Sequence, residues 1–101
     1  VERGWLGIGI QTMTPALLIA LDAANIKSGV LINMVGPNSP AEIGGMTQGD
    51  IIIQFDGKYV HDATSFQRMV EESPVGKIVN LNIIRGGLKK QLYIEIKKLT
   101  S

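Results

Sequence analysis

The residues that could act in catalysis are few and scattered in this chain of 101 residues. The only histidine, His61, lies beside Asp62, but a Ser/His/Asp site also needs a positioned serine, and the sequence has no Gly-x-Ser-x-Gly elbow. With one histidine and no cysteine, a zinc site is not expected. Glu71 and Glu72 are adjacent, so on a helix they point in different directions and do not form a catalytic carboxylate pair. We therefore expect no catalytic residue, metal or cofactor in this chain. We expect instead that the protein acts by binding a ligand or a partner.

The strongest binding signal is a glycine-rich stretch near the N-terminus, which reads Gly-Trp-Leu-Gly-Ile-Gly-Ile over residues 4–10. Its alternating apolar residues predict a strand. Gly7 lies between two large aliphatic residues, and such a glycine can turn successive backbone N–H groups toward one point. A nest of this kind binds anions, including the C-terminal carboxylate of a peptide. A distorted edge strand is the alternative, and this stretch alone leaves both open.

The bulk composition indicates one ordinary globular domain. Lys and Arg number 10 against 9 for Asp and Glu, a balance that gives no indication of a nucleic-acid partner. The absence of cysteine excludes disulfides and leaves the compartment open. No apolar run reaches the length of a membrane helix. Because the most distinctive motif comes as early as residue 5, we expect the sequence to be a piece of a longer protein.

Turn and capping signals predict a small, mainly antiparallel sheet or partly open barrel with two substantial helices. Ser39-Pro40 followed by Glu42 is typical of a capping box, Asp62 of a helix N-cap, and Asp-Gly at 56–57 of a tight hairpin. The helix at 16–21 is apolar nearly all round, so we expect it to be largely buried or to face another domain. The predicted helices span 16–21 and 63–72, with a single helical turn at 41–43. The first predicted strand ends at residue 12, and the other strands span 30–35, 51–55, 58–60, 77–85 and 90–98.

The middle of the chain carries the most specific motif, Asn-Ser-Pro-Ala-x-x-Gly-Gly-Met-x-x-Gly-Asp-Ile-Ile over residues 38–52. Together with Trp-Leu-Gly-Ile at 5–8 and Asp-Gly-Lys at 56–58, it resembles a PDZ domain over practically the whole chain. The opening Arg-Gly-Trp-Leu-Gly-Ile-x-Ile-Gln at 3–11 is similar to the junction before the first PDZ domain of the Do/HtrA (DegP-like) serine proteases of bacterial envelopes.

This resemblance implies a PDZ-like α+β fold, mainly β with two helices, in a partly open antiparallel barrel or sandwich. It also implies circular permutation, with the final strand at 90–98 filling the place of the first strand of animal PDZ domains. One PDZ domain would span 1–101, with 1–4 as a linker from a protease domain and 99–101 as a tail.

The resemblance also implies a peptide-binding groove made of three groups. A carboxylate-binding loop would present the backbone N–H groups of Leu6, Gly7 and Ile8, an open strand edge would follow it, and one face of the second helix would form the opposite wall. Leu6, Ile8 and Val70 would enclose the last apolar side chain of a ligand. Ala63 stands where related domains often have a histidine, so the resemblance does not extend to selection for a hydroxyl. The implied peptide-binding residues are Trp5, Leu6, Gly7, Ile8, Gly9, Ile10, Gln11, Ala63, Gln67 and Val70, with Phe66 and Met69 in the core.

The function implied is that of a regulatory module in a serine endopeptidase of the periplasm or envelope, which captures C-terminal or extended hydrophobic segments of misfolded proteins. Its partners would be these peptides, its own protease domain and a second PDZ domain, within a trimer-based homo-oligomer. Two alternatives stay open. The module belongs to another protease or secretion protein, or it serves assembly, with its groove filled by a neighbouring domain.

Overall fold

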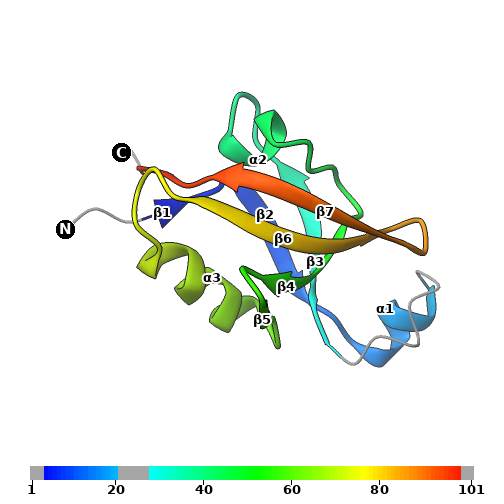
Figure 1. Cartoon of the computed structure of the whole chain (residues 1–101). Helices are drawn as coiled ribbons and strands as arrows, with labels where there is room; N and C mark the ends of the chain where they lie inside the picture. The colour runs from blue at the N-terminus through cyan, green and yellow to red at the C-terminus, as the bar shows by residue number, and fades with distance from the viewer. Residues whose placement is uncertain (1–3, 21–27, 99–101) are drawn as a thin grey trace.

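A computed structural model describes residues 4–20 and 28–98 of the chain (Figure 1). In chain order the elements are β1 (Gly4–Trp5), β2 (Ile8–Thr12), α1 (Pro15–Ala20), β3 (Val30–Val35), α2 (Pro40–Ile43), β4 (Ile51–Phe55), β5 (Lys58–Tyr59), α3 (Ala63–Glu72), β6 (Ile78–Arg85), β7 (Leu88–Glu95) and β8 (Lys97–Lys98).

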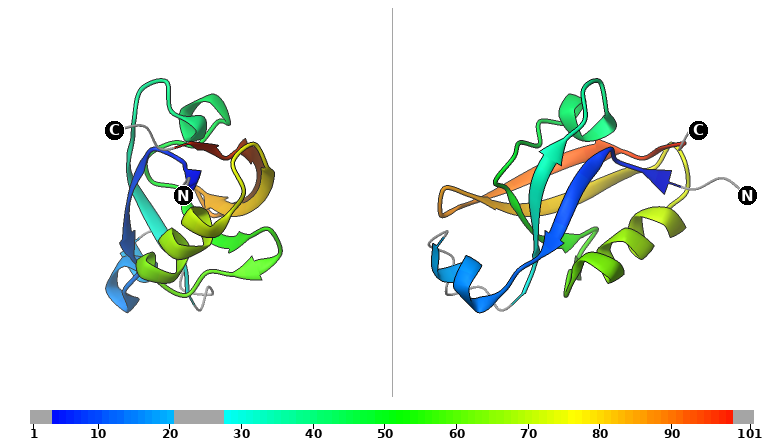
Figure 2. Two further views of the ribbon diagram at one scale, coloured as in Figure 1. Left: turned by 90° about the vertical axis from the view of Figure 1, so that its left-hand side faces the viewer. Right: turned by 180° about the vertical axis from the view of Figure 1, so that it is seen from behind.

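Two open antiparallel sheets form the body of the domain and do not close into a barrel. The larger sheet has the strand order β2-β3-β4-β6-β7, with β5 paired to β4, so β2 lies at one edge. The smaller sheet pairs β1 with β8, so that the last strand returns beside the first, with Gly4 opposite Lys98. Helix α3 lies beside β1 and β2 (Figure 2). The mainly β fold with antiparallel sheets expected from the sequence is therefore confirmed.

A single main core fills the space between the sheets and α3. Phe66 of α3 is almost completely buried, and its ring meets that of Phe55 edge-on at a centroid distance of 5.7 Å. Met69 packs against this cluster from the same helix. The expected inward orientation of both α3 residues is thus confirmed, and the helix is fixed in place beside the edge strand.

Local capping chemistry determines where α2 and α3 begin. Asp62 accepts a hydrogen bond from the Ser65 backbone N–H at 2.7 Å, and the Ser65 hydroxyl completes a capping box. The Ser39 hydroxyl accepts from the Glu42 backbone N–H at 3.2 Å, as the motif predicts. The Glu42 carboxylate, however, accepts from the backbone N–H of Asn38 rather than that of Ser39, so the box is displaced by one residue.

The expectation for the first helix is wrong in one respect. None of the residues of α1 is buried, and Ile19 is 70% exposed. Leu18 is half-buried against a small second cluster that includes Ile51 and Ile84. Contact of α1 with a neighbouring domain therefore stays a prediction, and the predicted last helical residue, Leu21, lies outside the described residues.

The bounds of the last three predicted strands also differ from the structure, because β5 ends at Tyr59, β6 begins at Ile78 and β7 begins at Leu88. The final strand is divided at Ile96, whose side chain enters the core, into β7 and β8. The preceding hairpin closes through Gly86 and Gly87, with φ of 59° and 81°, a conformation that glycine adopts without strain. Within residues 4–20 and 28–98, we find no helix long and apolar enough to cross a membrane.

Candidate functional site

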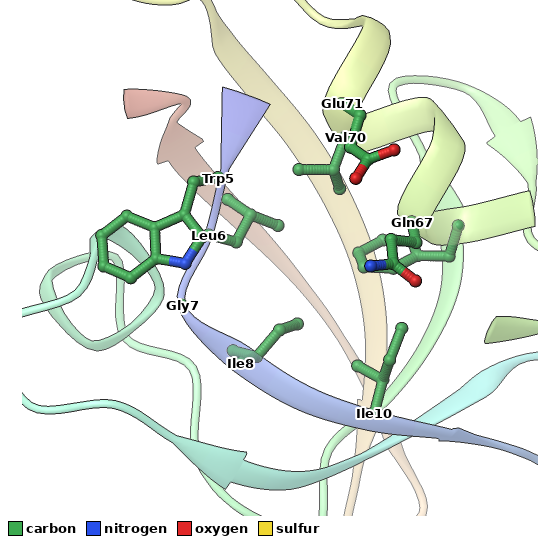
Figure 3. Close-up of a pocket in the computed structure, with 9 residues that line it drawn as sticks. Trp5, Leu6, Gly7, Ile8, Ile10, Gln67, Val70 and Glu71 are labelled. Atoms are coloured by element: carbon green, nitrogen blue, oxygen red, sulfur yellow. The ribbon is translucent and has the colours of Figure 1, made fainter. Parts of the chain in front are cut away.

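A groove of about 300 Å³ lies between the Trp5–Ile8 loop, the start of β2 and helix α3 (Figure 3). The side chains of Leu6, Ile8 and Ile10 point toward α3, which contributes the opposite wall. The lining is mostly apolar with a few polar groups, as ligand sites usually are. The groove is lined by Trp5, Leu6, Gly7, Ile8, Ile10, Phe66, Gln67, Val70 and Glu71.

The Trp5–Ile8 loop is held by its carbonyl groups. The Leu6 carbonyl accepts a hydrogen bond from the Ala41 backbone N–H at 3.0 Å, and the Gly7 carbonyl accepts from the Gly36 N–H at 2.8 Å. Gly7 has a φ of +81°, and a Cβ built on it would lie 2.4 Å from the Cβ of Ser39. Only glycine therefore fits this point, and the loop is pressed against the buried N-cap of α2.

Two backbone N–H groups of the same loop have no hydrogen-bond acceptor among the described residues. Among the described residues, no backbone or side-chain acceptor bonds the N–H of Leu6 or that of Gly7. Since unpaired backbone N–H groups are strong donors, two of them in succession beside a glycine with positive φ form a site for an anion.

The edge of β2 continues this site. On one side β2 pairs with β3, and its other side faces the groove. The pairing shifts between Gly9, opposite Met34, and Ile10, opposite Ile32, so β3 carries one extra residue there. This residue, Asn33, donates a hydrogen bond to the Gln11 side chain at 3.3 Å, and its carboxamide fills the space that a Gly9 side chain would need. The edge is thus open to the backbone of an added strand.

The wall formed by α3 combines apolar and polar groups. Val70 and the amide of Gln67 face the β2 side chains across the groove (Figure 3). Phe66 belongs to the core and also lines the groove, which the sequence reasoning did not anticipate. Glu71 was also missed, because the i, i+4, i+7 pattern used to choose wall residues passes over it.

Of the other predicted site residues, Trp5 belongs to the groove lining, whereas Gly9, Gln11 and Ala63 do not. Trp5 is 36% exposed as a residue, and its indole ring points away from α3 (Figure 3). Gly9 and Gln11 lie on β2 outside the cavity lining. Ala63 lies at the end of the groove, where its backbone N–H donates to the Thr12 hydroxyl at 3.0 Å. Arg3, the first residue of the motif at 3–11, lies outside the described residues.

The pKa of Asp62, which caps the α3 wall of the groove, is lowered. The Ser65 backbone N–H and hydroxyl hold the pKa of Asp62 below its usual range, and the positive end of α3 favours the same charge. Within residues 4–20 and 28–98, no cluster of His, Cys, Asp or Glu side chains could hold a metal. The groove can therefore bind through backbone donors, a strand edge and apolar contact.

Comparison with known proteins agrees with this geometry. The family model described as PDZ domain matches residues 4–96. The human protein called serine protease HTRA3 is 36% identical over 80 residues, which are 73% of this chain and 18% of that protein. A probable periplasmic serine endoprotease described as DegP-like, from Pseudomonas fulva, is 32% identical over 96 residues, or 95% of this chain and 20% of that protein.

Among solved structures, the HtrA3 PDZ domain bound to the phage-derived ligand FGRWV superposes with a TM-score of 0.81 at 28% identity. The match covers 98% of this chain and 89% of that domain. By contrast, the chain spans about a fifth of the length of the protease relatives it matches.

Proposed function

The chain belongs to the PDZ domain family, with HtrA-type serine proteases as its relatives, and we propose that it captures peptides by their C-termini in the groove between β2 and α3. The carboxylate of the ligand accepts hydrogen bonds from the Trp5–Ile8 loop. The peptide backbone then extends β2 by one strand, and the last side chain enters the apolar pocket.

The observation that carries this proposal is the pair of amides of Leu6 and Gly7, which no acceptor among the described residues bonds, at the start of an open strand edge. A peptide that ends at the loop supplies the missing acceptor, because its terminal carboxylate has two oxygens and a full negative charge. An internal peptide segment has no such group, so it binds more weakly.

The apolar lining favours an aliphatic or aromatic last residue. Leu6, Ile8 and Val70 surround the space next to the loop, and burial of one such side chain is worth about 1.5–3 kcal/mol. Each net backbone hydrogen bond adds about 0.5–1.5 kcal/mol, while ordering of the peptide opposes binding. A dissociation constant in the micromolar range is therefore expected. The HtrA3 ligand, which ends in valine, has the expected kind of last residue.

In a longer protein, the module would serve a serine endopeptidase of the cell envelope. It would hold C-terminal segments of misfolded proteins near a protease domain that supplies the catalytic residues. The DegP-like relatives named as periplasmic support this location. A second PDZ domain and a trimer-based assembly are further elements of the proposal, and they rest on the resemblance stated above.

Trp5 provides the test, because it is the only tryptophan and lies in the loop itself. We would titrate the chain with an acetylated octapeptide ending in Arg-Leu-Val, once as the free acid and once as the C-terminal amide, and follow tryptophan fluorescence and heat. The free acid should bind in the micromolar range, and the amide at least about tenfold more weakly, a difference of about 1.4 kcal/mol.

Equal affinities for the two forms would rule out carboxylate capture. Absence of binding by both would favour the assembly alternative, in which a neighbouring domain fills the groove.

A further inference from the structure

The N-terminal segment contacts α3 at two places, one beyond each end of the groove lining. At the loop end, a Cβ built on Gly4 would lie 2.2 Å from the Val70 carbonyl oxygen, so the backbone of β1 touches the helix. At the far end, the Thr12 hydroxyl accepts from the Ala63 backbone N–H at 3.0 Å. The space between β2 and α3 is thus a trough with two ends.

The alternation of side chains along β2 places every second side chain along this trough. Ile8, Ile10 and Thr12 project from the same face of the strand, because successive residues of a strand point to opposite sides. The first two line the cavity, and the third makes the closing hydrogen bond. A peptide paired with β2 has the same period, so its alternate side chains enter the trough beside these three positions.

We propose that Thr12 determines how much of a ligand is recognised, by ending the trough after two side-chain sites. The last residue of the ligand lies beside Ile8, and the residue two before it lies beside Ile10 and Gln67. The side chain two further back meets the Thr12–Ala63 contact and has no site, so recognition is confined to the last four residues. This inference rests on the proposed function, because it assumes that the carboxylate lies at the Trp5–Ile8 loop.

The same contact also determines what the start of α3 can offer a ligand. The first-turn N–H groups of a helix are free donors unless they are capped. Here the Ala63 N–H is bonded to Thr12, and the Ser65 N–H is bonded to Asp62. A ligand hydroxyl therefore finds these two donors already occupied, and a serine or threonine near its C-terminus gives no advantage.

The test compares acetyl-FGRWV with acetyl-GRWV, which differ only in the fifth residue from the end. On the wild-type chain the two free-acid peptides should bind with affinities within about twofold of each other. In the Thr12→Ala variant the trough opens, and the longer peptide should bind about tenfold more tightly than the shorter one. Thr12→Ser, which keeps the hydroxyl, should behave as the wild type.

Thr14→Ala is the matched control, since its hydroxyl accepts from Leu17 at the start of α1 and lies outside the groove. Thermal unfolding of each variant verifies that it is folded. A wild-type preference of more than about fivefold for the longer peptide, or a Thr12→Ala variant with no length preference, would overturn the role of Thr12. If neither free acid binds the wild type, both this inference and the proposed function fail, whereas tight binding of both with a length preference removes only the inference.

Discussion

Two turns of this domain are held rigid in opposite ways. The Trp5–Ile8 loop is fixed through its carbonyls and through a glycine packed on Ser39, and within residues 4–20 and 28–98 no acceptor bonds the N–H groups of Leu6 and Gly7. The turn at residues 45–50 is fixed by Asp50, which is completely buried. Its carboxylate accepts from the Arg85 guanidinium at 2.7 and 2.8 Å.

The difference separates the loop that we propose to bind a ligand from a structural turn. The Asp50 carboxylate also accepts from the backbone N–H and the hydroxyl of Thr47, and Arg85 further donates to the Gly45 carbonyl at 2.8 Å. The turn thus uses its charged groups within the domain, whereas the described residues supply no acceptor for two N–H groups of the Trp5–Ile8 loop. Changes at the two places should therefore separate stability from binding.

The largest expected effect is the loss of stability on removing Asp50. Asp50→Ala leaves the Arg85 guanidinium without its buried partner, and disruption of such a pair costs about 3–5 kcal/mol, toward the lower end here because Arg85 is partly exposed. Urea unfolding measures this loss, while peptide affinity of the folded fraction should be unchanged. The control is Asp56→Ala, whose pair with Lys77 at 2.8 Å is exposed and worth about 0–1 kcal/mol. Equal losses in the two variants would contradict the distinction.

Next in size is the effect of a methyl group at Gly7. Gly7→Ala brings both left-handed strain and a clash with Ser39, so we expect a loss of about 1–3 kcal/mol in stability and at least about tenfold in peptide affinity. Gly87→Ala is a close control, because Gly87 has the same φ of 81° but nothing within 4 Å of its added Cβ. It should show the strain and leave binding intact. Undiminished binding by Gly7→Ala would mean that the loop does not hold the ligand.

A smaller effect is expected at the support behind the loop. The buried Ser39 hydroxyl donates to the Gly36 carbonyl at 2.7 Å and caps α2, so Ser39→Ala should cost about 1 kcal/mol of stability and weaken peptide binding without abolishing it. Ser73→Ala, which removes a hydroxyl bonded to the Met69 carbonyl, is the control for loss of one hydroxyl elsewhere. The two variants are compared by calorimetric titration and thermal unfolding.

The smallest effect is an acid-dependent part of stability. Burial alone would raise the pKa of Asp50, but the hydrogen bonds from Arg85 and Thr47 and the charge of Arg85 outweigh it and hold this pKa below its usual range. The stabilisation is therefore complete above the unfolded value of about 3.9 and is lost as the pH falls through the lower, folded value. The difference in unfolding free energy between wild type and Asp50→Ala should shrink below about pH 4. A difference independent of pH there would contradict this origin.

These two turns also show how far sequence reasoning reaches. The loop was predicted because Gly7 and its aliphatic neighbours form a local pattern, and local patterns also predicted the caps at Ser39 and Asp62. The pair of Asp50 with Arg85 was not predicted, because the two residues are 35 positions apart and isolated charges usually lie in solvent. Thr12 escaped notice for the same reason, since its partner on α3 is 51 residues away.

The burial predicted for α1 failed for the reverse reason. The apolar residues from Leu17 to Ile19 indicate that the helix needs a packing partner. Within the domain, however, Leu18 is only half-buried. Composition cannot tell whether the covering partner belongs to the same domain.

The pairing of β1 with β8 has a mechanical consequence. Gly4 and Lys98 lie opposite each other in an antiparallel ladder of only two residue pairs. A pulling force applied between Gly4 and Lys98 therefore acts on one residue pair at a time. The two pairs break one after the other and are not loaded together. Trp5, which pairs with Lys97, is the next residue to be released, and it leads directly into the Trp5–Ile8 loop. Tension between Gly4 and Lys98 would thus loosen the Trp5–Ile8 loop before it disturbed the larger sheet.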